Sequence, residues 1–105
     1  MSYLESLFSL DGKISIVTGA ARGNGKSISE ALLRSGSTVI LIDVLKKELL
    51  KTVKKFQDEN LPAIEYYCDI TKKKQISDLG KYIKKNFGRL DILVNNAGIT
   101  LSDSS

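Results

Sequence analysis

The 105-residue sequence contains no histidine, and this absence excludes more chemistry than any other feature of its composition. Without histidine the chain cannot form a Ser/His/Asp or Cys/His catalytic group, nor a metal site with histidine ligands. A single cysteine, Cys68, rules out an intrachain disulfide and a CxxC pair. This cysteine usage fits a reducing compartment, so we expect a cytoplasmic protein without a metal site.

Long hydrophobic runs are also missing. The strongest aliphatic run, residues 39–42, is far too short to span a bilayer, and residues 1–10 lack the basic start and apolar stretch of a secretory leader. We therefore predict a soluble chain with no membrane partner. The net charge of +4 comes mostly from lysines within residues 46–55 and 72–85. We assign them to solvated helix faces, not to a nucleic-acid surface, because no aromatic residues alternate with them.

What the sequence does contain is an alternation of short apolar runs and helical periods. Runs rich in β-branched and aromatic residues predict strands at residues 13–18, 38–42, 63–68 and 90–94. Between them lie three helical periods, of which the first ends at Gly36, the second covers residues 45–56, and the third follows Thr71 as N-cap and ends at Gly88. Right-handed crossovers then predict an α/β, Rossmann-type open parallel sheet with strand order 3-2-1-4.

A glycine-rich loop, TGAARGNG at residues 18–25, joins the first strand to the first helix. Glycine accepts a positive φ in the turn, and its missing side chain lets a diphosphate approach backbone amides at the positive end of the helix. Gly25 would also let helix and strand pack closely. A triphosphate P-loop is the second interpretation, because Gly25-Lys26-Ser27 imitates its end, but Ala20 stands where that loop needs glycine.

The second predicted strand closes on Asp43, at about the 20-residue spacing from the loop that a dinucleotide site requires. A carboxylate there accepts hydrogen bonds from the adenosine ribose and repels a 2′-phosphate, which favours NAD over NADP. Arg22 argues in the other direction, because a guanidinium beside the loop is suited to a 2′-phosphate. A purely structural role for Asp43, as a cap for the helix near Leu45, also stays open.

Taken together, these residues resemble the short-chain dehydrogenase/reductase family. Its loop pattern TGxxxGxG is matched by residues 18–25, the acidic end of strand two by Asp43, the pair after strand three by Asp69 and Ile70, and NNAG after strand four by residues 95–98. The resemblance covers essentially the whole chain. One departure is Asn24, at a position where the family usually has an aliphatic residue.

The resemblance implies a set of coenzyme contacts. Asp69 would cap the adenine amine while Ile70 covers the ring, and the NNAG segment would pass close to the nicotinamide-side ribose, with Asn95 tying the central strands together. The implied cofactor-binding residues are Gly19, Arg22, Asn24, Gly25, Asp43, Asp69, Ile70, Asn96, Ala97 and Gly98.

The activity implied by the resemblance is hydride transfer between a nicotinamide coenzyme, NAD in preference to NADP, and a small alcohol or ketone. The family's catalytic Ser and Tyr-x-x-x-Lys are missing, because none of the four tyrosines is followed by lysine four positions later. We therefore interpret residues 1–105 as a partial dinucleotide-binding domain, without catalytic residues and inactive alone. The catalytic half and the interface of a homo-oligomer would lie elsewhere in a longer protein.

The predicted fourth strand motivates a rival interpretation. Its apolar outer edge would have no partner in this sequence, which is a template for docking another segment. A complete short protein that binds a dinucleotide without catalysis, or that pairs with a partner which completes its sheet, would share that feature.

Overall fold

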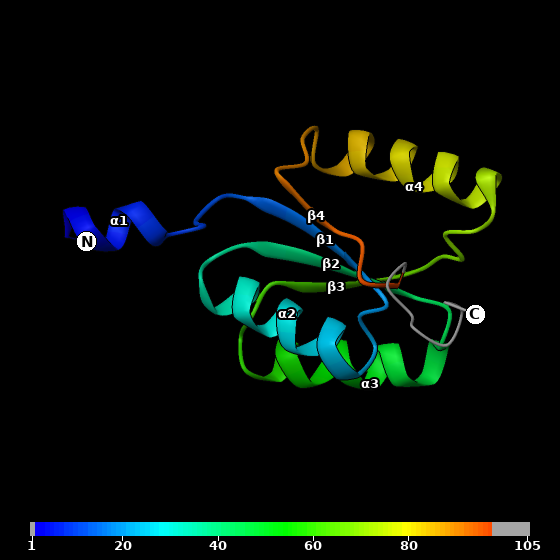
Figure 1. The fold of residues 1–105 in the computed structure, drawn as a ribbon, viewed down its shortest axis with the longest axis horizontal. Coiled ribbons are helices and arrows are strands. Elements are labelled where there is room, and N and C mark those ends of the chain that lie inside the picture. The colour runs from blue at the N-terminus through cyan, green and yellow to red at the C-terminus, as the bar shows by residue number, and fades with distance from the viewer. Residues whose placement is uncertain (1, 98–105) are drawn as a thin grey trace, which may run out of the picture.

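After a short N-terminal helix, strands and helices alternate along the chain in the computed structural model, which describes residues 2–97 (Figure 1). The elements in chain order are α1 Tyr3–Phe8, β1 Ile14–Thr18, α2 Gly23–Arg34, β2 Thr38–Asp43, α3 Lys46–Asp58, β3 Ala63–Tyr67, α4 Lys73–Asn86 and β4 Ile92–Val94. The four predicted strands are confirmed with small changes at their ends.

All strand pairs in the sheet are parallel, and the order is β3-β2-β1-β4, as predicted. β1 lies between β2 and β4, with Thr18 opposite Ile42 on one side and Val17 opposite Val94 on the other. This register brings the carboxyl ends of all three strands to one edge of the sheet. The loops that follow those strands therefore meet at that edge, as expected for a ligand site in an open α/β sheet.

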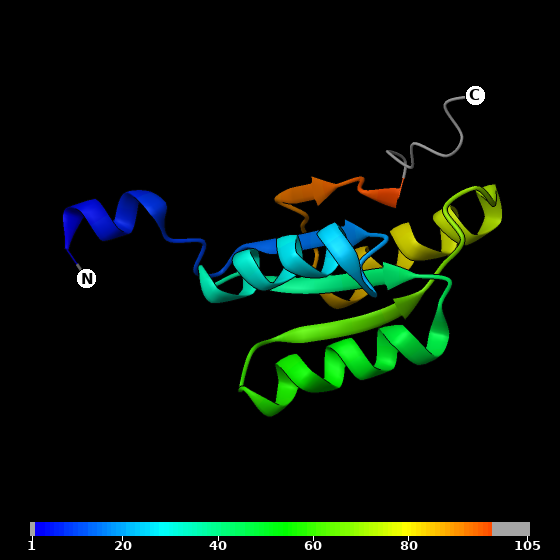
Figure 2. The same cartoon turned by 60° about the horizontal axis from the view of Figure 1, so that its bottom comes forward.

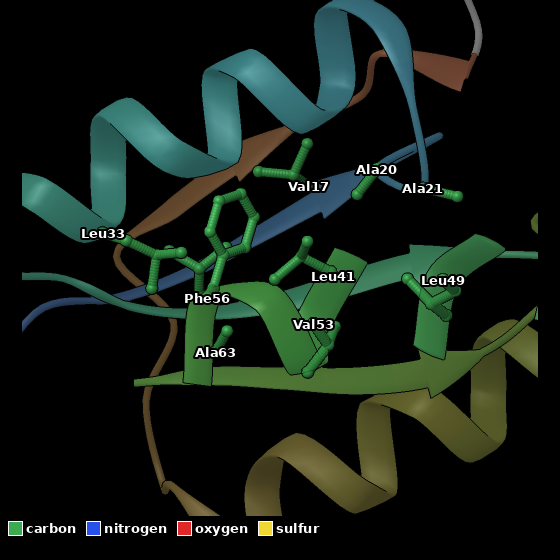
Figure 3. Close-up of a cluster of buried hydrophobic side chains, with 10 residues drawn as sticks. Val17, Ala20, Ala21, Leu33, Leu41, Leu49, Val53, Phe56 and Ala63 are labelled. Atoms are coloured by element: carbon green, nitrogen blue, oxygen red, sulfur yellow. The ribbon is translucent and has the colours of Figure 1, made fainter. Parts of the chain in front are cut away.

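One face of the sheet is covered by α2 and α3 and holds the larger core (Figures 1 and 2). Because side chains alternate between the two faces of a strand, Val17 and Leu41 point to this side. They meet the apolar stripe of α3, formed by Leu49, Val53 and Phe56, all of which are completely or almost completely buried (Figure 3). Each such side chain contributes about 1.5–3 kcal/mol relative to an exposed position.

Among residues 2–97, α4 is the only helix that covers the opposite face (Figure 1). Ile40 and Ile42 point to this side and pack against Leu79 and Ile83 of α4. Cover is incomplete near β4, where a cavity of about 510 Å³ opens between the strand and the helix. Leu93 of β4 is 62% exposed.

The predicted N-cap of the third long helix is wrong. α4 begins after Lys72, which makes no capping side-chain hydrogen bond. Thr71 instead turns back toward the end of β3, because its hydroxyl and its amide both donate to Asp69 Oδ1, at 2.6 and 2.9 Å. These charge-assisted hydrogen bonds orient Thr71 toward Asp69, and α4 begins two residues later at Lys73.

The helix α1 was not predicted. A capping box starts it, since the Ser2 hydroxyl accepts from the Glu5 amide and the Glu5 carboxylate accepts from the Ser2 amide. None of the α1 residues is buried. Among the helices formed by residues 2–97, none has the length and hydropathy of a membrane span.

Candidate functional site

The glycine-rich loop between β1 and α2 needs glycine at three places. Gly19 and Gly23 adopt φ values of +63° and +60°, in the left-handed region that side chains disfavour. Position 25 requires glycine for a different reason, because a Cβ atom there would overlap the carbonyl oxygen of Gly19. The predicted positive φ of glycine in the turn is confirmed, and Gly25 lets α2 pack closely against the loop rather than against the strand itself.

Hydrogen bonds from neighbouring elements hold the first half of this loop. The Ala20 amide donates to the Ile42 carbonyl at 3.1 Å, which continues the β1–β2 ladder into the loop. Asn96 donates from Nδ2 to the Gly19 carbonyl at 3.2 Å and so connects the loop to the segment after β4. Ala20 and Ala21 are buried, and this part of the loop is fixed before any ligand binds.

Asp43, at the end of β2, connects the loop to the following turn. Its Oδ2 accepts from the Ala21 amide at 3.0 Å, and its Oδ1 accepts from the amides of Val44 and Leu45 at 2.8 and 3.1 Å. The alternative role as a cap of α3 is wrong: the carboxylate binds amides of the turn before the helix, and α3 begins at Lys46 with no side-chain capping hydrogen bond. A carboxylate has about four lone-pair sites, so acceptor capacity remains for a ligand.

The first turn of α2 has no local counter-charge. The residue before it, Arg22, is extended and makes no capping side-chain hydrogen bond, and the turn contains no acidic residue. Arg22 and Asn24 are both exposed. Uncapped amides and the helix dipole therefore give this end of α2 a positive character that suits a phosphate group.

The segment after β4 lies beside the end of β1. Thr18 donates its hydroxyl hydrogen to Asn95 Oδ1 at 3.0 Å and accepts from the Ala97 amide at 3.1 Å. Asn95 thus ties β1 to the β4 side, as the family resemblance implied. Of the remaining NNAG residues, Gly98 lies outside the described residues.

A cavity of about 370 Å³ opens where these segments meet. Its lining residues are Thr18, Gly19, Ile42, Asp43, Val44, Cys68, Asp69, Ile70, Thr71 and Ala97. Five predicted site residues are therefore brought together there. Arg22, Asn24, Gly25 and Asn96 do not line the cavity, although the last two contact the loop that does.

The β3 side of the cavity presents one charged and one uncharged group. Hydrogen bonds from the Thr71 hydroxyl, and secondly from its amide, lower the pKa of Asp69, so this carboxylate stays ionised at neutral pH. Burial raises the pKa of the Cys68 thiol and keeps it protonated. Gln75, which sequence reasoning missed, accepts from the Asp69 amide through Oε1 at 2.7 Å and holds this corner.

The larger cavity beside β4 has a different character. Isoleucine and leucine side chains form most of its wall, its charged residues are Lys84 and Arg89, and no carboxylate lines it. It offers no acceptor of the kind that reads ribose hydroxyls. Within residues 2–97, no three His, Cys, Asp or Glu side chains gather where they could hold a metal ion.

A model of the short chain dehydrogenase family matches residues 13–105. The chain therefore belongs to the short-chain dehydrogenase/reductase family, as the motifs indicated, and the fold with its parallel order β3-β2-β1-β4 agrees. This is an oxidoreductase family, and its coenzyme is a nicotinamide dinucleotide. The glycine cradle, the uncapped start of α2 and the Asp43 carboxylate fit such a ligand.

Among its relatives, the diacetyl reductase [(S)-acetoin forming] of Staphylococcus epidermidis is 41% identical over 87 residues, which are 83% of this chain and 34% of that protein. The chain thus spans about a third of the length of such relatives.

Two solved structures show the same arrangement of elements. The 2-keto-3-deoxy-D-gluconate dehydrogenase of Streptococcus agalactiae is 37% identical with a TM-score of 0.83, over 93% of this chain and 37% of that one. A gluconate 5-dehydrogenase of Burkholderia cenocepacia, in complex with NADP and tartrate, is 26% identical with a TM-score of 0.80, over 90% of this chain and 37% of that one.

Proposed function

We propose that residues 1–105 form the coenzyme-binding part of an oxidoreductase that transfers hydride between NAD and a small alcohol or ketone. The observation that carries the proposal is the cavity at the carboxyl edge of the sheet, where the glycine loop, Asp43 and the Asp69-Ile70 pair meet. The bound coenzyme would supply the hydride chemistry. The residues of this chain would bind and orient it.

Each group in the site has a proposed task. The uncapped amides at the start of α2 would receive the diphosphate, with Arg22 and Asn24 exposed beside it. Asp43 would accept from the adenosine ribose hydroxyls through its remaining lone pairs. Asp69 would accept from the adenine amine, because its carboxylate is ionised, and Ile70 would cover the ring. The segment after β4 would lie close to the ribose on the nicotinamide side, through Asn96, Ala97 and Gly98.

The preference for NAD rests on the fixed position of Asp43. Three backbone amides hold its carboxylate at the end of β2, so the side chain cannot turn away from a 2′-phosphate without losing hydrogen bonds. Repulsion between the two anions would then disfavour NADP. Two observations favour NADP instead: the exposed Arg22 beside the loop, and the NADP complex of the gluconate 5-dehydrogenase. The affinities for the two coenzymes are therefore compared directly.

The proton-transfer chemistry would come from outside this sequence. The chain spans about a third of its relatives, and no tyrosine in it is followed by lysine four positions later. We therefore propose that residues 1–105 alone do not turn over an alcohol or ketone. The catalytic side chains and the surfaces of a cytoplasmic homo-oligomer would belong to the remainder of a longer protein.

The test is a fluorescence titration of the purified protein with NADH and with NADPH. We expect the protein to bind NADH more tightly than NADPH. Asp43→Asn should weaken the affinity for NADH about 10-fold or more, since charge-assisted hydrogen bonds contribute about 1.5–3 kcal/mol each. The same variant should reduce the difference in affinity between NADH and NADPH. Asp58→Asn, which changes an exposed carboxylate at the far end of α3, is the control and should leave both affinities unchanged. Equal NADH binding by Asp43→Asn and the unchanged protein would refute the proposal.

A further inference from the structure

One buried hydroxyl on α3 makes a contact that the site described above does not explain. Thr52 is 4% exposed and lies on the core face of α3, between Leu49 and Val53, although lysines surround it in the sequence. Its hydroxyl donates to the carbonyl oxygen of Ala21 in the glycine loop, with Oγ1 and the oxygen 2.6 Å apart. The two residues are 31 positions apart in the chain.

This contact differs from those of other hydroxyls on the helices. Ser29 and Ser35 donate to the carbonyl oxygens four residues earlier, Gly25 and Ala31, and so remain within their own helix region. Such back-bonding is the usual way for a helical serine or threonine to satisfy its hydroxyl. Thr52 reaches across to another segment instead.

The direction of the Ala21 carbonyl group determines the direction of the next backbone amide in the loop. The amide of Ala21 is held by Asp43, so with Thr52 on its carbonyl both polar backbone groups of this residue are fixed. The carbonyl of Ala21 and the amide of Arg22 belong to one planar peptide. Because that peptide is trans, the two groups point in opposite directions. A carbonyl held toward α3 therefore directs the Arg22 amide away from α3.

We propose that Thr52 is a positioning residue for coenzyme binding: by holding the Ala21 carbonyl, it sets the direction of the amides through which the loop enters α2. The inference rests on the proposed function, because the ligand for those amides is the diphosphate of a dinucleotide. Asp43 and Thr52 then act on the same residue from two sides. Asp43 comes from the end of β2, and Thr52 comes from the second turn of α3.

The test compares three variants by NADH fluorescence titration and thermal unfolding of the purified protein. Thr52→Val keeps the shape and removes the hydroxyl, and Thr52→Ser keeps the hydroxyl. Ser15→Ala is the matched control, since Ser15 has a completely buried hydroxyl paired with Ser37 at 2.6 Å, near the amino-terminal end of β1 and away from the loop. The dissociation constant for NADH and the unfolding temperature are measured for each.

We expect Thr52→Val to weaken the affinity for NADH about 3- to 10-fold. This factor corresponds to the typical net contribution of one buried hydrogen bond. Thr52→Ser should bind NADH as the unchanged protein does, and Ser15→Ala should lose stability without losing affinity. Equal affinity of Thr52→Val and the unchanged protein overturns the role of Thr52 while leaving the proposed function intact. A loss in Thr52→Ser as large as in Thr52→Val also overturns it. An unchanged protein that does not bind NADH overturns the proposed function.

If Thr52→Val does not fold, Thr52→Cys replaces it, because a thiol has nearly the same size as the serine side chain and donates weakly. Amide hydrogen exchange gives a second readout. We expect the Ala21 amide to exchange faster in the variant that loses the donor, because Asp43 then holds that residue alone. Unchanged exchange at Ala21 contradicts the inference.

Discussion

Helices cover the two faces of the sheet to different extents. On the face of α2 and α3, Phe56 and its neighbours are completely buried, and the glycine loop lies directly at the end of that core (Figure 3). On the face of α4, Leu79 and Ile83 are the only helix side chains among residues 2–97 that are buried against the sheet, and a cavity of about 510 Å³ remains beside β4. The difference lies in how much apolar surface each face covers.

Within residues 2–97, the glycine loop is held firmly by its neighbours, whereas the region beside β4 is only partly covered. The loop that we assign to the diphosphate is fixed from three sides, by β2, by α3 and by the segment after β4. β4 is hydrogen-bonded to β1 along one edge, but its Leu93 side chain is largely exposed. We conclude that the better packed face positions the diphosphate end of the proposed coenzyme site, whereas the Asp69 corner also depends on Gln75 of α4. Changes on α4 away from Gln75 should therefore affect stability less and coenzyme binding hardly at all.

Truncation of one phenylalanine on each face should give the largest single loss of stability. Phe56→Ala removes a completely buried ring and should cost about 3–5 kcal/mol, whereas Phe87→Ala removes a half-buried ring at the end of α4 and should cost about 1–2 kcal/mol. Urea unfolding measures both values. Equal losses would show that the two faces contribute alike to stability, against our interpretation.

A pair of glycine-to-alanine variants should each change stability by less than Phe56→Ala, and the two changes should have opposite signs. In Gly25→Ala the new methyl group would overlap the Gly19 carbonyl, so we expect a loss of about 1–3 kcal/mol and weaker NADH binding. In Gly80→Ala the methyl group enters open space on α4, and the better helix propensity should add up to about 1 kcal/mol. Thermal unfolding and an NADH titration check both. A stabilised Gly25→Ala that still binds NADH would contradict the account of the loop.

The sequence predicted the fold because strand patterns are local. Near-continuous apolar runs separated by helical periods indicate a parallel sheet, and the glycine loop and Asp43 fall where that fold places a ligand. Thr71 was assigned wrongly, because sequence spacing does not show whether a hydroxyl binds a helix amide or a nearby carboxylate. The capping box at Ser2 and Glu5 is a sequence signal that indicates the start of α1.

Other parts of the site could not be read from the sequence at all. The Asp43 carboxylate binds three backbone amides, and backbone groups have no sequence signature. Thr52 contacts a residue 31 positions away, and its position among lysines suggests a solvated helix face. Contacts of this kind depend on how helices are seated on the sheet, which local patterns do not specify.

An NMR titration of the isotope-labelled protein with NADH distinguishes the two faces most directly. We predict that the largest changes in amide chemical shift fall at residues 19–25 and around Asp43 and Asp69, with little change in α4. Changes centred on Leu79, Ile83 and Leu93, or a spectrum that NADH leaves unaltered, would contradict the central claim that the glycine loop and Asp43 bind the coenzyme.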